Sequence, residues 1–305
     1  MSALLIEAST PLCLLQDAGR FGVRHLGVTQ GGAADWVSMS WANTLLGNSL
    51  DAAVIEVTLG GLTLVAEQDC CLALAGADLG AMLDSRPLEP WRSFFMGKGQ
   101  RLRFTQPILG ARAYLAAPGG FDAPAVLGSC STVIREELGG LDGLGKPLAQ
   151  GDRLSYCGAA FVLQGLSYQQ IPDLKLSTPL DVVLGAQIGL FSGPSLFDAF
   201  NSDWTLDTRA DRMGIRLLGP ELTYMGEPMI SEGIPLGAIQ VPPDGQPIVL
   251  LNDRQTIGGY PRLGALTPLS LASLAQCLPG SVIRLKPMLQ NTAHQQHMQY
   301  VQRFG

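Results

Sequence analysis

Short hydrophobic runs alternate with polar and turn-forming residues along most of the chain. In the first half, runs bounded by Gly or Asp predict strands over 53–60, 62–67, 70–76, 100–104 and 111–118. The same rhythm continues after residue 150 in the segments DRLSY, FVLQGL, LDVVLG, MGIRLLG and SVIRLKP. A spacing of roughly 8–12 residues between turns is typical of barrels and sandwiches rather than of βαβ units.

Helical patterns are few and short. They cover 36–46, 193–200, 270–278 and 291–305. The first has Asp35 as a candidate N-cap and Gly47 as its stop, and Thr267 before a proline marks the start of the third. We therefore predict an all-β fold with a few short helices.

The domain boundary is predicted from a polar stretch that contains two prolines, GLSYQQIPDLKLSTP. It separates two blocks that each contain several predicted strands. We predict an N-terminal β subdomain over 1–165, a linker over 166–179, a C-terminal β subdomain over 180–288 and a polar tail over 289–305.

Composition limits the classes of partner. The 305-residue chain is 47% hydrophobic and 15% charged, with a net charge of −6 and no cluster of Lys or Arg. These values indicate a compact globular protein and argue against nucleic acid or an anionic membrane as a partner. No basic signal-peptide start and no apolar run near the ~20 residues of a membrane span are present, so we predict a cytoplasmic protein.

Candidate nucleophiles, metal ligands and phosphate loops are sparse. The six cysteines are scattered without a CxxC pair and there are only three histidines, which predicts free thiols and no metal site. Cys130 in GSCST is predicted to be a small buried thiol, because the stretch is not a nucleophile elbow. GLDGLGKP matches part of a phosphate-binding loop, but Pro147 stands where a hydroxyl residue is required.

Polar residues gather instead in a few segments. The densest is IQVPPDGQPIVLLNDRQTIGGYP (239–261), which sets two hydrophobic runs among far more polar and turn-forming residues than a hairpin needs. QDAGRFGVRHLG and SDWTLDTRADRMGIRLLG add carboxylates, arginines and a histidine. Arginine forks suit carboxylate or phosphate groups, so these segments together predict polar groups around a mainly β pocket.

Six blocks, in this order, resemble one family. They are LQDAGRFGVRHLGV, GAADWVSMSWANTLLGN, AVIEVTLGGLTL, AYLAAPGGFDAPAVLGSCST, DRMGIRLLGP and ISEGIPLGAIQVPPDGQPIVLLNDRQTIGGYPRLG. The family is that of the biotin-dependent carboxyltransferases, also called allophanate hydrolase subunit 2. It includes the KipA-type proteins, the C subunit of bacterial ATP-dependent 5-oxoprolinase and the carboxyltransferase region of urea carboxylase. The resemblance implies an all-β fold with two cyclophilin-like β-barrel subdomains.

The resemblance also implies that 240–261 lines a pocket for a small amide. A substrate N–C=O group would be polarised by Gln240, Gln246 or the main-chain N–H groups of Gly258 and Gly259. Asp253 would orient or deprotonate a nitrogen, although Asn252-Asp253 is also good turn chemistry.

The remaining candidates are expected to contact the substrate or carboxybiotin. Arg20 or Arg212 would hold a carboxylate or carboxybiotin. The other expected contacts to the substrate are His25, Gln255, Thr256 and Tyr260. As catalytic residues we predict Asp253, Gln240 and Arg212.

Three functions follow from the resemblance. The first is the C subunit of ATP-dependent 5-oxoprolinase, which would open 5-oxo-L-proline to L-glutamate. It would act with two partners, a LamB/YcsF-type A component and a B component similar to allophanate hydrolase subunit 1 (KipI-like). The second is the carboxyltransferase component of a biotin-dependent urea or amide carboxylase, and the third is a KipA-like regulator that binds a kinase inhibitor.

The resemblance also sets expectations for cofactors. ATP is the expected cofactor of the complex, on a site carried by this chain or by its partners. Biotin is not expected to be attached to this chain, because no biotinylation segment is present.

Overall fold

The computed structural model divides into two compact units that are not contiguous in sequence. One comprises Met1–Phe21 and Gly31–Lys175, and the other comprises Gly22–Gln30 and Leu176–Gly305. Gly22–Gln30, which the sequence analysis assigned to the first domain, therefore belongs to the second unit. The structure describes residues 2–158, 163–175 and 178–304.

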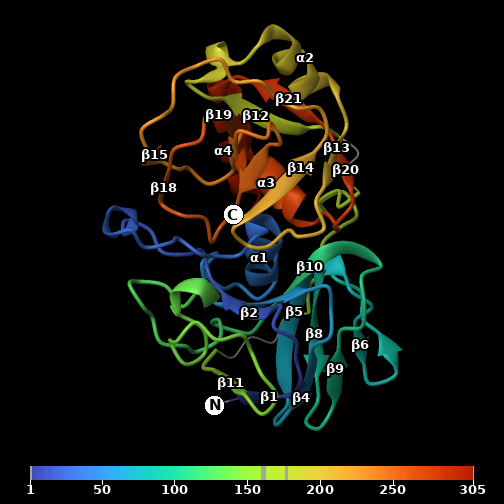
Figure 1. Cartoon of the computed structure of the whole chain (residues 1–305). Coiled ribbons are helices and arrows are strands. Elements are labelled where there is room, and N and C mark those ends of the chain that lie inside the picture. Colours follow the sequence, from blue (N-terminus) through green and yellow to red (C-terminus); the bar gives the residue numbers. More distant parts are fainter. Residues whose placement is uncertain (1, 159–162, 176–177, 305) are drawn as a thin grey trace. The chain divides into compact units, whose positions relative to one another are not determined.

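The first unit is built from two antiparallel sheets (Figure 1). One sheet has the strand order β11-β1-β4-β9-β6-β7, with the bounds β1 Ser2–Ala8, β4 Thr63–Ala66, β6 Met82–Leu83, β7 Arg86–Pro87, β9 Arg101–Arg103 and β11 Arg153–Tyr156. The other has the order β2-β3-β10-β5-β8, with β2 Cys13–Gln16, β3 Val54–Thr58, β5 Cys70–Asp78, β8 Arg92–Met96 and β10 Leu109–Ala116.

Both sheets contribute to one hydrophobic core. Leu4 of β1 and Leu64 of β4 come from one sheet, and Ile55 of β3, Leu72 of β5 and Leu115 of β10 come from the other. Each of these side chains is fully buried. At ~25 cal/mol per Å² of apolar surface removed from water, this cluster supplies the main force that holds the two sheets together.

Helix α1 (Trp36–Thr44) packs against β5 and β10 of the first unit. Its N-cap is Asp35, whose side chain accepts a hydrogen bond from the Ser38 N–H at 3.0 Å, as predicted from the sequence. The Tyr114 hydroxyl joins this cap to the sheet, because it accepts from the Asp35 N–H at 2.7 Å and donates to Glu56 at 2.8 Å. Burial and the neighbouring carboxylate raise the pKa of Tyr114 well above its ordinary value.

Asp17 organises the loop that contains Cys130. Its carboxylate accepts from the hydroxyls of Ser129 and Ser131, each at 2.5 Å, and from the Cys130 N–H at 2.8 Å. Burial by itself raises the pKa of the Asp17 carboxyl, but these bonds and one from the Gly19 N–H hold the pKa below its usual range. Burial and the charge of Asp17 raise the pKa of the Cys130 thiol far above its usual range, so Cys130 is not a thiolate nucleophile.

The second unit is built around one twisted sheet with the order β20-β13-β14-β17-β16-β19-β12-β21. Its strands are β12 Leu180–Leu184, β13 Trp204–Leu206, β14 Gly214–Leu218, β16 Ala238–Gln240, β17 Ile248–Leu250, β19 Arg262–Leu266, β20 Val282–Ile283 and β21 Leu285–Met288. Neighbouring strands are antiparallel except for β12 and β21. A separate pair joins β15 (Glu232–Gly233) to β18 (Ile257–Gly258).

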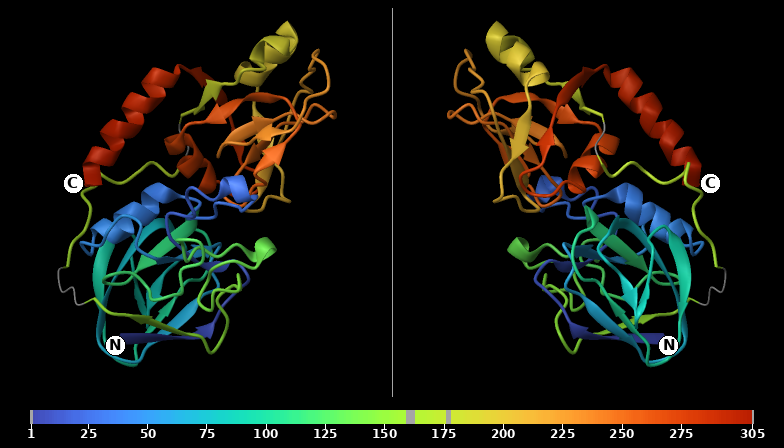
Figure 2. Two further views of the ribbon diagram at one scale, coloured as in Figure 1. Left: turned by 90° about the vertical axis from the view of Figure 1, so that its left-hand side faces the viewer. Right: turned by 90° about the vertical axis from the view of Figure 1, so that its right-hand side faces the viewer.

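The helices of the second unit cover parts of this sheet. They are α2 (Gly193–Asn201), α3 (Pro268–Ala275) and α4 (Gln290–Val301), and Figure 2 shows α4 as the long C-terminal helix. Helix α3 packs against β12 and β19, while α4 contacts β12 and α2 contacts β21. The core beneath them includes Trp204, Val249 and Leu274, all fully buried.

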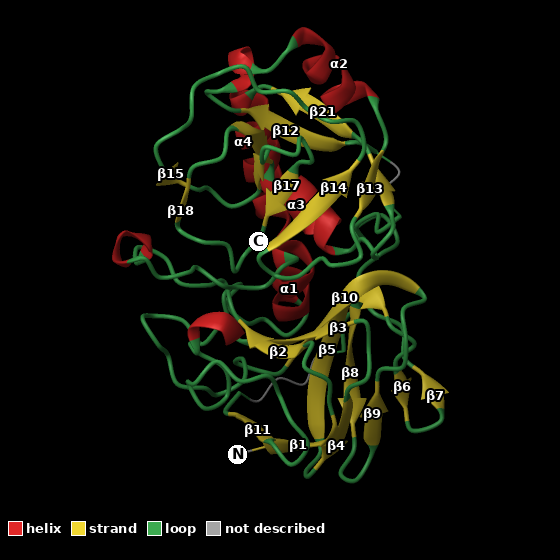
Figure 3. Cartoon of the chain, in the orientation of Figure 1, coloured by secondary structure: helices red, strands yellow, loops and turns green. Residues whose placement is uncertain are grey.

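The sequence prediction of a mainly β chain with short helices is confirmed (Figure 3). The predicted strands at 53–60, 70–76 and 111–118 are β3, β5 and β10, and the helix after Thr267 is α3. Part of the predicted strand FVLQGL lies outside the described residues. Within the parts of the chain that the structure describes, no helix is long and apolar enough to cross a membrane.

Replacing Asp17 with Asn is expected to destabilise the protein by about 1–3 kcal/mol at pH 7, because buried donors lose a charged acceptor. The folded-state pKa of Asp17 is depressed, so its contribution is complete above the unfolded-state pKa of about 3.9 and is lost as pH falls through the lower folded-state pKa. Denaturant unfolding of wild type and variant between pH 7 and pH 3 measures this.

The exposed Asp51→Asn is the control and is expected to stay within about 0.5 kcal/mol of wild type. Equal stability of wild type and Asp17→Asn at pH 7 would contradict the stabilising role of the Asp17 carboxylate. A difference in unfolding free energy that grows as the pH is lowered would contradict it as well.

Candidate functional site

The segment 239–261 forms a hairpin followed by an irregular arm. Strands β16 and β17 pair in antiparallel register, with Ile239 opposite Val249. The turn between them closes with a bond from the Gly245 N–H to the Pro242 carbonyl at 2.9 Å. Gly245 has φ +72°, and a Cβ atom there would lie 2.9 Å from the Leu222 nitrogen, so the turn requires glycine.

The two faces of this sheet have different roles because side chains alternate along each strand. Ile215 of β14, Ile239 of β16 and Val249 of β17 point into the hydrophobic core. The intervening residues lie on the other face, where Ile248 is opposite Arg216 on one side and opposite Gln240 on the other. A row that runs arginine, isoleucine, glutamine therefore crosses three strands outside the core.

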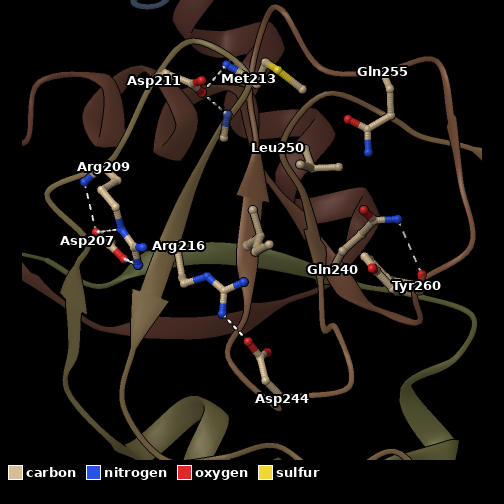
Figure 4. Close-up of a pocket in the computed structure, with 12 residues that line it drawn as sticks. Asp207, Arg209, Asp211, Met213, Arg216, Gln240, Asp244, Leu250, Gln255 and Tyr260 are labelled. Atoms are coloured by element: carbon tan, nitrogen blue, oxygen red, sulfur yellow. Dashed lines mark hydrogen bonds and ion pairs between the residues drawn. The ribbon is translucent and has the colours of Figure 1, made fainter.

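A cavity of about 680 Å³ opens on this second face (Figure 4). Its floor is apolar and is formed by Met213, Ile248 and Leu250. Apart from Gly214, the rest of the lining is polar or charged and consists of Asp207, Arg209, Asp211, Arg216, Gln240, Asp244, Gln255 and Tyr260. An apolar floor beneath a largely polar and charged wall suits a small polar ligand, because the polar groups fix the orientation of a bound molecule.

Two ion pairs border the cavity. Arg209 donates to both carboxylate oxygens of Asp207, at 3.1 and 2.6 Å, and Arg216 contacts Asp244 on the turn of the hairpin. The hydrogen bonds from Arg209 lower the pKa of Asp207 to about 2. The hydrogen bond from Arg216 likewise lowers the pKa of Asp244. Both carboxylates therefore stay ionised at neutral pH, and neither is suited to act as a general acid.

Three of the residues predicted from the sequence meet in this cavity. Gln240 is 2% exposed and its amide lies 3.4 Å from the Tyr260 carbonyl oxygen. Figure 4 shows Gln240, Gln255 and Tyr260 on the side of the cavity opposite the Asp207–Arg209 pair. Tyr260 also lines a second cavity of about 550 Å³, which Gly259 and Asp244 border as well.

Asp253 and Arg212, which were also predicted from the sequence, form an ion pair with each other. The Arg212 guanidinium donates from Nε and Nη2 to the two carboxylate oxygens of Asp253, at 2.9 and 3.0 Å. The side chains are 14% and 9% exposed, and neither lines either of the two cavities. A bidentate, nearly buried pair of this kind fixes the loop that carries Gln255.

Other predicted residues have main-chain partners. Gln246 donates to the Gly219 carbonyl and accepts from the Gly219 N–H, both at 3.0 Å, so it ties the hairpin to the end of β14. The Thr256 carbonyl accepts from the Ile234 N–H at 3.0 Å beside the β15–β18 pair that contains Gly258. These residues shape the arm around the cavity but are absent from the lining of the larger one.

The two candidates from the N-terminal region lie in different units. Arg20 belongs to the first unit, is 0% exposed and donates to the carbonyls of Val126 and Ser131 at 3.0 and 2.7 Å. It therefore holds the loop next to Cys130. His25 is exposed on a short 3-10 turn, Arg24–Leu26, which belongs to the second unit.

Asp207 and Arg209 were not singled out from the sequence, and Asp244 was given no role in a site. Arg216 and Asp211 were expected among the polar groups around a pocket, and both line the cavity. A signal was present for Arg216, because the alternation in MGIRLLG places it opposite the buried Ile215 and Leu217. Nothing in the sequence pattern marked Asp207, which follows a strand of only three residues. Among the residues that the structure describes, no three His, Cys, Asp or Glu side chains are grouped to hold a metal ion.

Comparison with known proteins defines the class. The family model described as "Carboxyltransferase domain, subdomain A and B" matches residues 26–287 of this chain. The match covers the cavity, the hairpin and most of both units, and the chain belongs to this carboxyltransferase family.

Two relatives and one solved structure show which members of the family this chain resembles. The chain is 38% identical over 270 residues to the C subunit of 5-oxoprolinase from Escherichia coli (strain K12), covering 88% of this chain and 86% of that protein. It is 36% identical over 274 residues to the protein of the same name from Haemophilus influenzae, covering 89% and 87%. The crystal structure of Kluyveromyces lactis urea carboxylase matches with a TM-score of 0.91 and 26% identity, over 99% of this chain but only 29% of that one.

The buried pair predicts a coupled effect on stability. Asp253→Asn is expected to lower the free energy of unfolding by about 3 kcal/mol, because it leaves the Arg212 charge nearly buried without its counter-charge. The double variant Arg212→Met/Asp253→Asn is expected to lose less stability than the sum of the single changes Arg212→Met and Asp253→Asn. Denaturant unfolding of the four proteins of the cycle measures the coupling.

The exposed Arg284–Asp203 pair serves as the matched control and is expected to show a much smaller coupling, because solvent screens both charges. A coupling between Arg212 and Asp253 no larger than in this control would contradict the structural assignment.

Proposed function

We propose that this chain is the C subunit of an ATP-dependent 5-oxoprolinase, in which it helps to open 5-oxo-L-proline to L-glutamate. The observation that carries the proposal is the similarity to two proteins named as the C subunit of 5-oxoprolinase, each of which this chain matches over more than four fifths of both lengths. The cavity beside Gln240 supports it, because it offers an apolar floor together with an amide side chain that can pair with an N–C=O group.

The lining fits a lactam in chemical terms. The five-membered ring of 5-oxoproline is largely apolar and suits the floor of Ile248 and Leu250. The amide of Gln240 offers a donor and an acceptor to the N–C=O group. A donor held at the carbonyl oxygen stabilises the negative charge that develops there when the ring is attacked, and this is the role proposed for Gln240.

The other predicted residues are proposed to act through position. Gln255 and Tyr260 would complete the wall of the cavity opposite Arg209. Asp253 and Arg212, which engage each other bidentately, would hold the loop that carries Gln255 rather than contact the substrate. Asp253 in this arrangement is a positioning residue and not the base that the sequence suggested.

ATP is proposed to be used by the assembled complex and to supply the free energy that drives ring opening. The GLDGLGKP stretch, which resembles a phosphate loop, does not fit ATP, since Pro147 replaces the required hydroxyl residue and Lys146 pairs with Asp142 at 3.0 Å. We therefore propose that the ATP site lies on the partner chains, the A and B components of the complex. The complex is proposed to act in the cytoplasm. No covalent biotin is proposed on this chain.

A second candidate function is the carboxyltransferase part of a urea or amide carboxylase. It is favoured by the fold match to Kluyveromyces lactis urea carboxylase, which extends over 99% of this chain. Both candidates require a cavity for a small N–C=O compound. They differ in substrate and in the need for a carboxylated biotin carrier.

The two candidate functions can be separated by experiment. The chain is co-expressed with candidate A and B components, and ATP-dependent release of glutamate from 5-oxo-L-proline is measured. The 5-oxoprolinase proposal predicts glutamate and ADP in equal amounts without added biotin carrier. Urea-dependent turnover with biotin carboxylase and carrier present, and none with 5-oxoproline, would replace it with the second candidate.

Two glutamines from the same segment give a matched pair of variants. Gln240→Leu removes a cavity donor and is expected to lower kcat/KM for 5-oxoproline by roughly 10²-fold or more. Gln246→Leu removes the bonds to Gly219 outside this cavity and is expected to lower thermal stability while turnover stays within a few-fold.

Purified complexes of both variants would be compared for turnover and melting temperature. A normal kcat/KM in Gln240→Leu, or the larger loss of activity in a folded Gln246→Leu complex, would show that the cavity is not the substrate site.

A further inference from the structure

Arg24 reaches the second unit on the segment Gly22–Gln30. Its guanidinium donates to two main-chain carbonyls, that of Ile234 and, at 3.0 Å, that of Thr256. The Thr256 carbonyl also accepts from the Ile234 N–H at 3.0 Å. Arg24 therefore lies where the chain segments next to β15 and β18 meet, and its side chain is half-buried.

A second guanidinium shares one of these acceptors. Arg254 is 3% exposed, and its Nε donates to the same Ile234 carbonyl at 3.1 Å. Its other nitrogens donate to the Leu251 carbonyl at 3.2 Å and, more weakly, to the side-chain oxygen of Gln30 at 3.5 Å. Two cations thus converge on a single neutral oxygen.

The charge at this place is not balanced by carboxylates. Within the described parts of the chain, neither Arg24 nor Arg254 has an Asp or Glu at ion-pair distance. The carboxylate that acts on Arg254 is Asp253, which is already held by Arg212. With Asp253 paired to Arg212, Arg24 and Arg254 add two positive charges that no carboxylate at ion-pair distance offsets among the described residues.

Burial makes this excess costly. Desolvation, followed by the charge of Arg24, lowers the pKa of Arg254 to about 10, and Asp253 opposes the shift only in part. A bound anion would offset like-charge repulsion in a region that water screens poorly. Because Arg254 is almost fully covered, an anion would contact the half-buried Arg24 and gain from the charge of Arg254 behind it.

We propose that Arg24, backed by Arg254, is a binding site for a carboxylate, and that its ligand is the carboxylate of the substrate. The naming of the ligand rests on the proposed function, since 5-oxoproline carries one carboxylate beside its lactam. A guanidinium fork matches a carboxylate in two-point geometry. The site is linked to the cavity through the chain, because Arg24 is bonded to the carbonyl of Thr256 and the preceding residue, Gln255, lines the cavity.

The test measures carboxylate binding without turnover. The full chain is heated while sodium acetate replaces sodium chloride at constant ionic strength, and the Kd follows from the saturable rise in melting temperature. Arg24→Gln is expected to weaken acetate binding at least 10-fold. Arg284→Gln, which removes an exposed arginine paired with Asp203, is the matched control and is expected to leave the Kd unchanged. Arg24→Lys, which keeps the charge but loses the fork, is expected to fall between wild type and Arg24→Gln.

Each other outcome overturns the site. A wild type that shows no saturable acetate response, the same response in wild type and Arg24→Gln, or a rise with sodium phosphate but none with acetate would exclude a carboxylate site at Arg24. The assembled complex then tests the ligand, because Arg24→Gln is expected to raise KM for 5-oxoproline at least 10-fold. If acetate binds at Arg24 but the complex releases no glutamate, the proposed function is refuted and the carboxylate site is not. If the complex releases glutamate and Arg24→Gln leaves KM unchanged, the assignment of the substrate carboxylate to Arg24 is refuted and the proposed function is not.

Discussion

Side-chain alternation along β14, β16 and β17 is the constraint on which the second unit depends. Ile215, Ile239 and Val249 must all face the core, and antiparallel register then leaves Arg216, Ile248 and Gln240 in one row on the opposite face. A slip of one residue would exchange the two sets. The hydrophobic core therefore positions the cavity, because the register that buries the aliphatic residues also sets where the polar ones lie.

Pairing of charges decides which polar residues remain available for a ligand. Arg212 and Asp253 engage each other, and Arg20 is fully enclosed by main-chain carbonyls of the first unit. Residues with such partners hold loops in place. Gln240, by contrast, makes a long contact to the Tyr260 carbonyl and lines the cavity. Among the described residues, the acceptors of Arg24 and Arg254 are neutral. The chemistry of the unit is therefore proposed to lie with the residues that have the weakest internal partners.

Local features were predictable from the sequence because local physics determines them. Asp35 and Thr267 cap the helices that begin after them, and the apolar alternation of 53–60 and 111–118 identifies β3 and β10. The resemblance of six sequence blocks to carboxyltransferases predicted the family, and the family model and the relatives confirm that prediction. It also pointed to the segment that supplies Gln240, Gln255 and Tyr260 to the cavity.

Long-range pairing was not predictable from the same pattern. Asp17 pairs with hydroxyls more than a hundred positions away, and Arg24 joins the second unit through Ile234 and Thr256. Nothing in QDAGRFGVRHLG distinguishes Arg20, which is enclosed in the first unit, from Arg24, which belongs to the second. Similarly, Asp253 looked like a free base because its partner Arg212 lies 41 residues before it. Such roles depend on the tertiary fold rather than on residue type.

The central claim is that the cavity on the Gln240 face holds the substrate, and a crystal structure of the co-expressed complex with 5-oxo-L-proline tests it most directly. The expected result is that the lactam ring lies over Ile248 and Leu250 and that the lactam carbonyl oxygen lies within hydrogen-bond distance of the Gln240 amide. A well-defined ligand elsewhere in the complex, with this cavity empty at saturating 5-oxoproline, would contradict it.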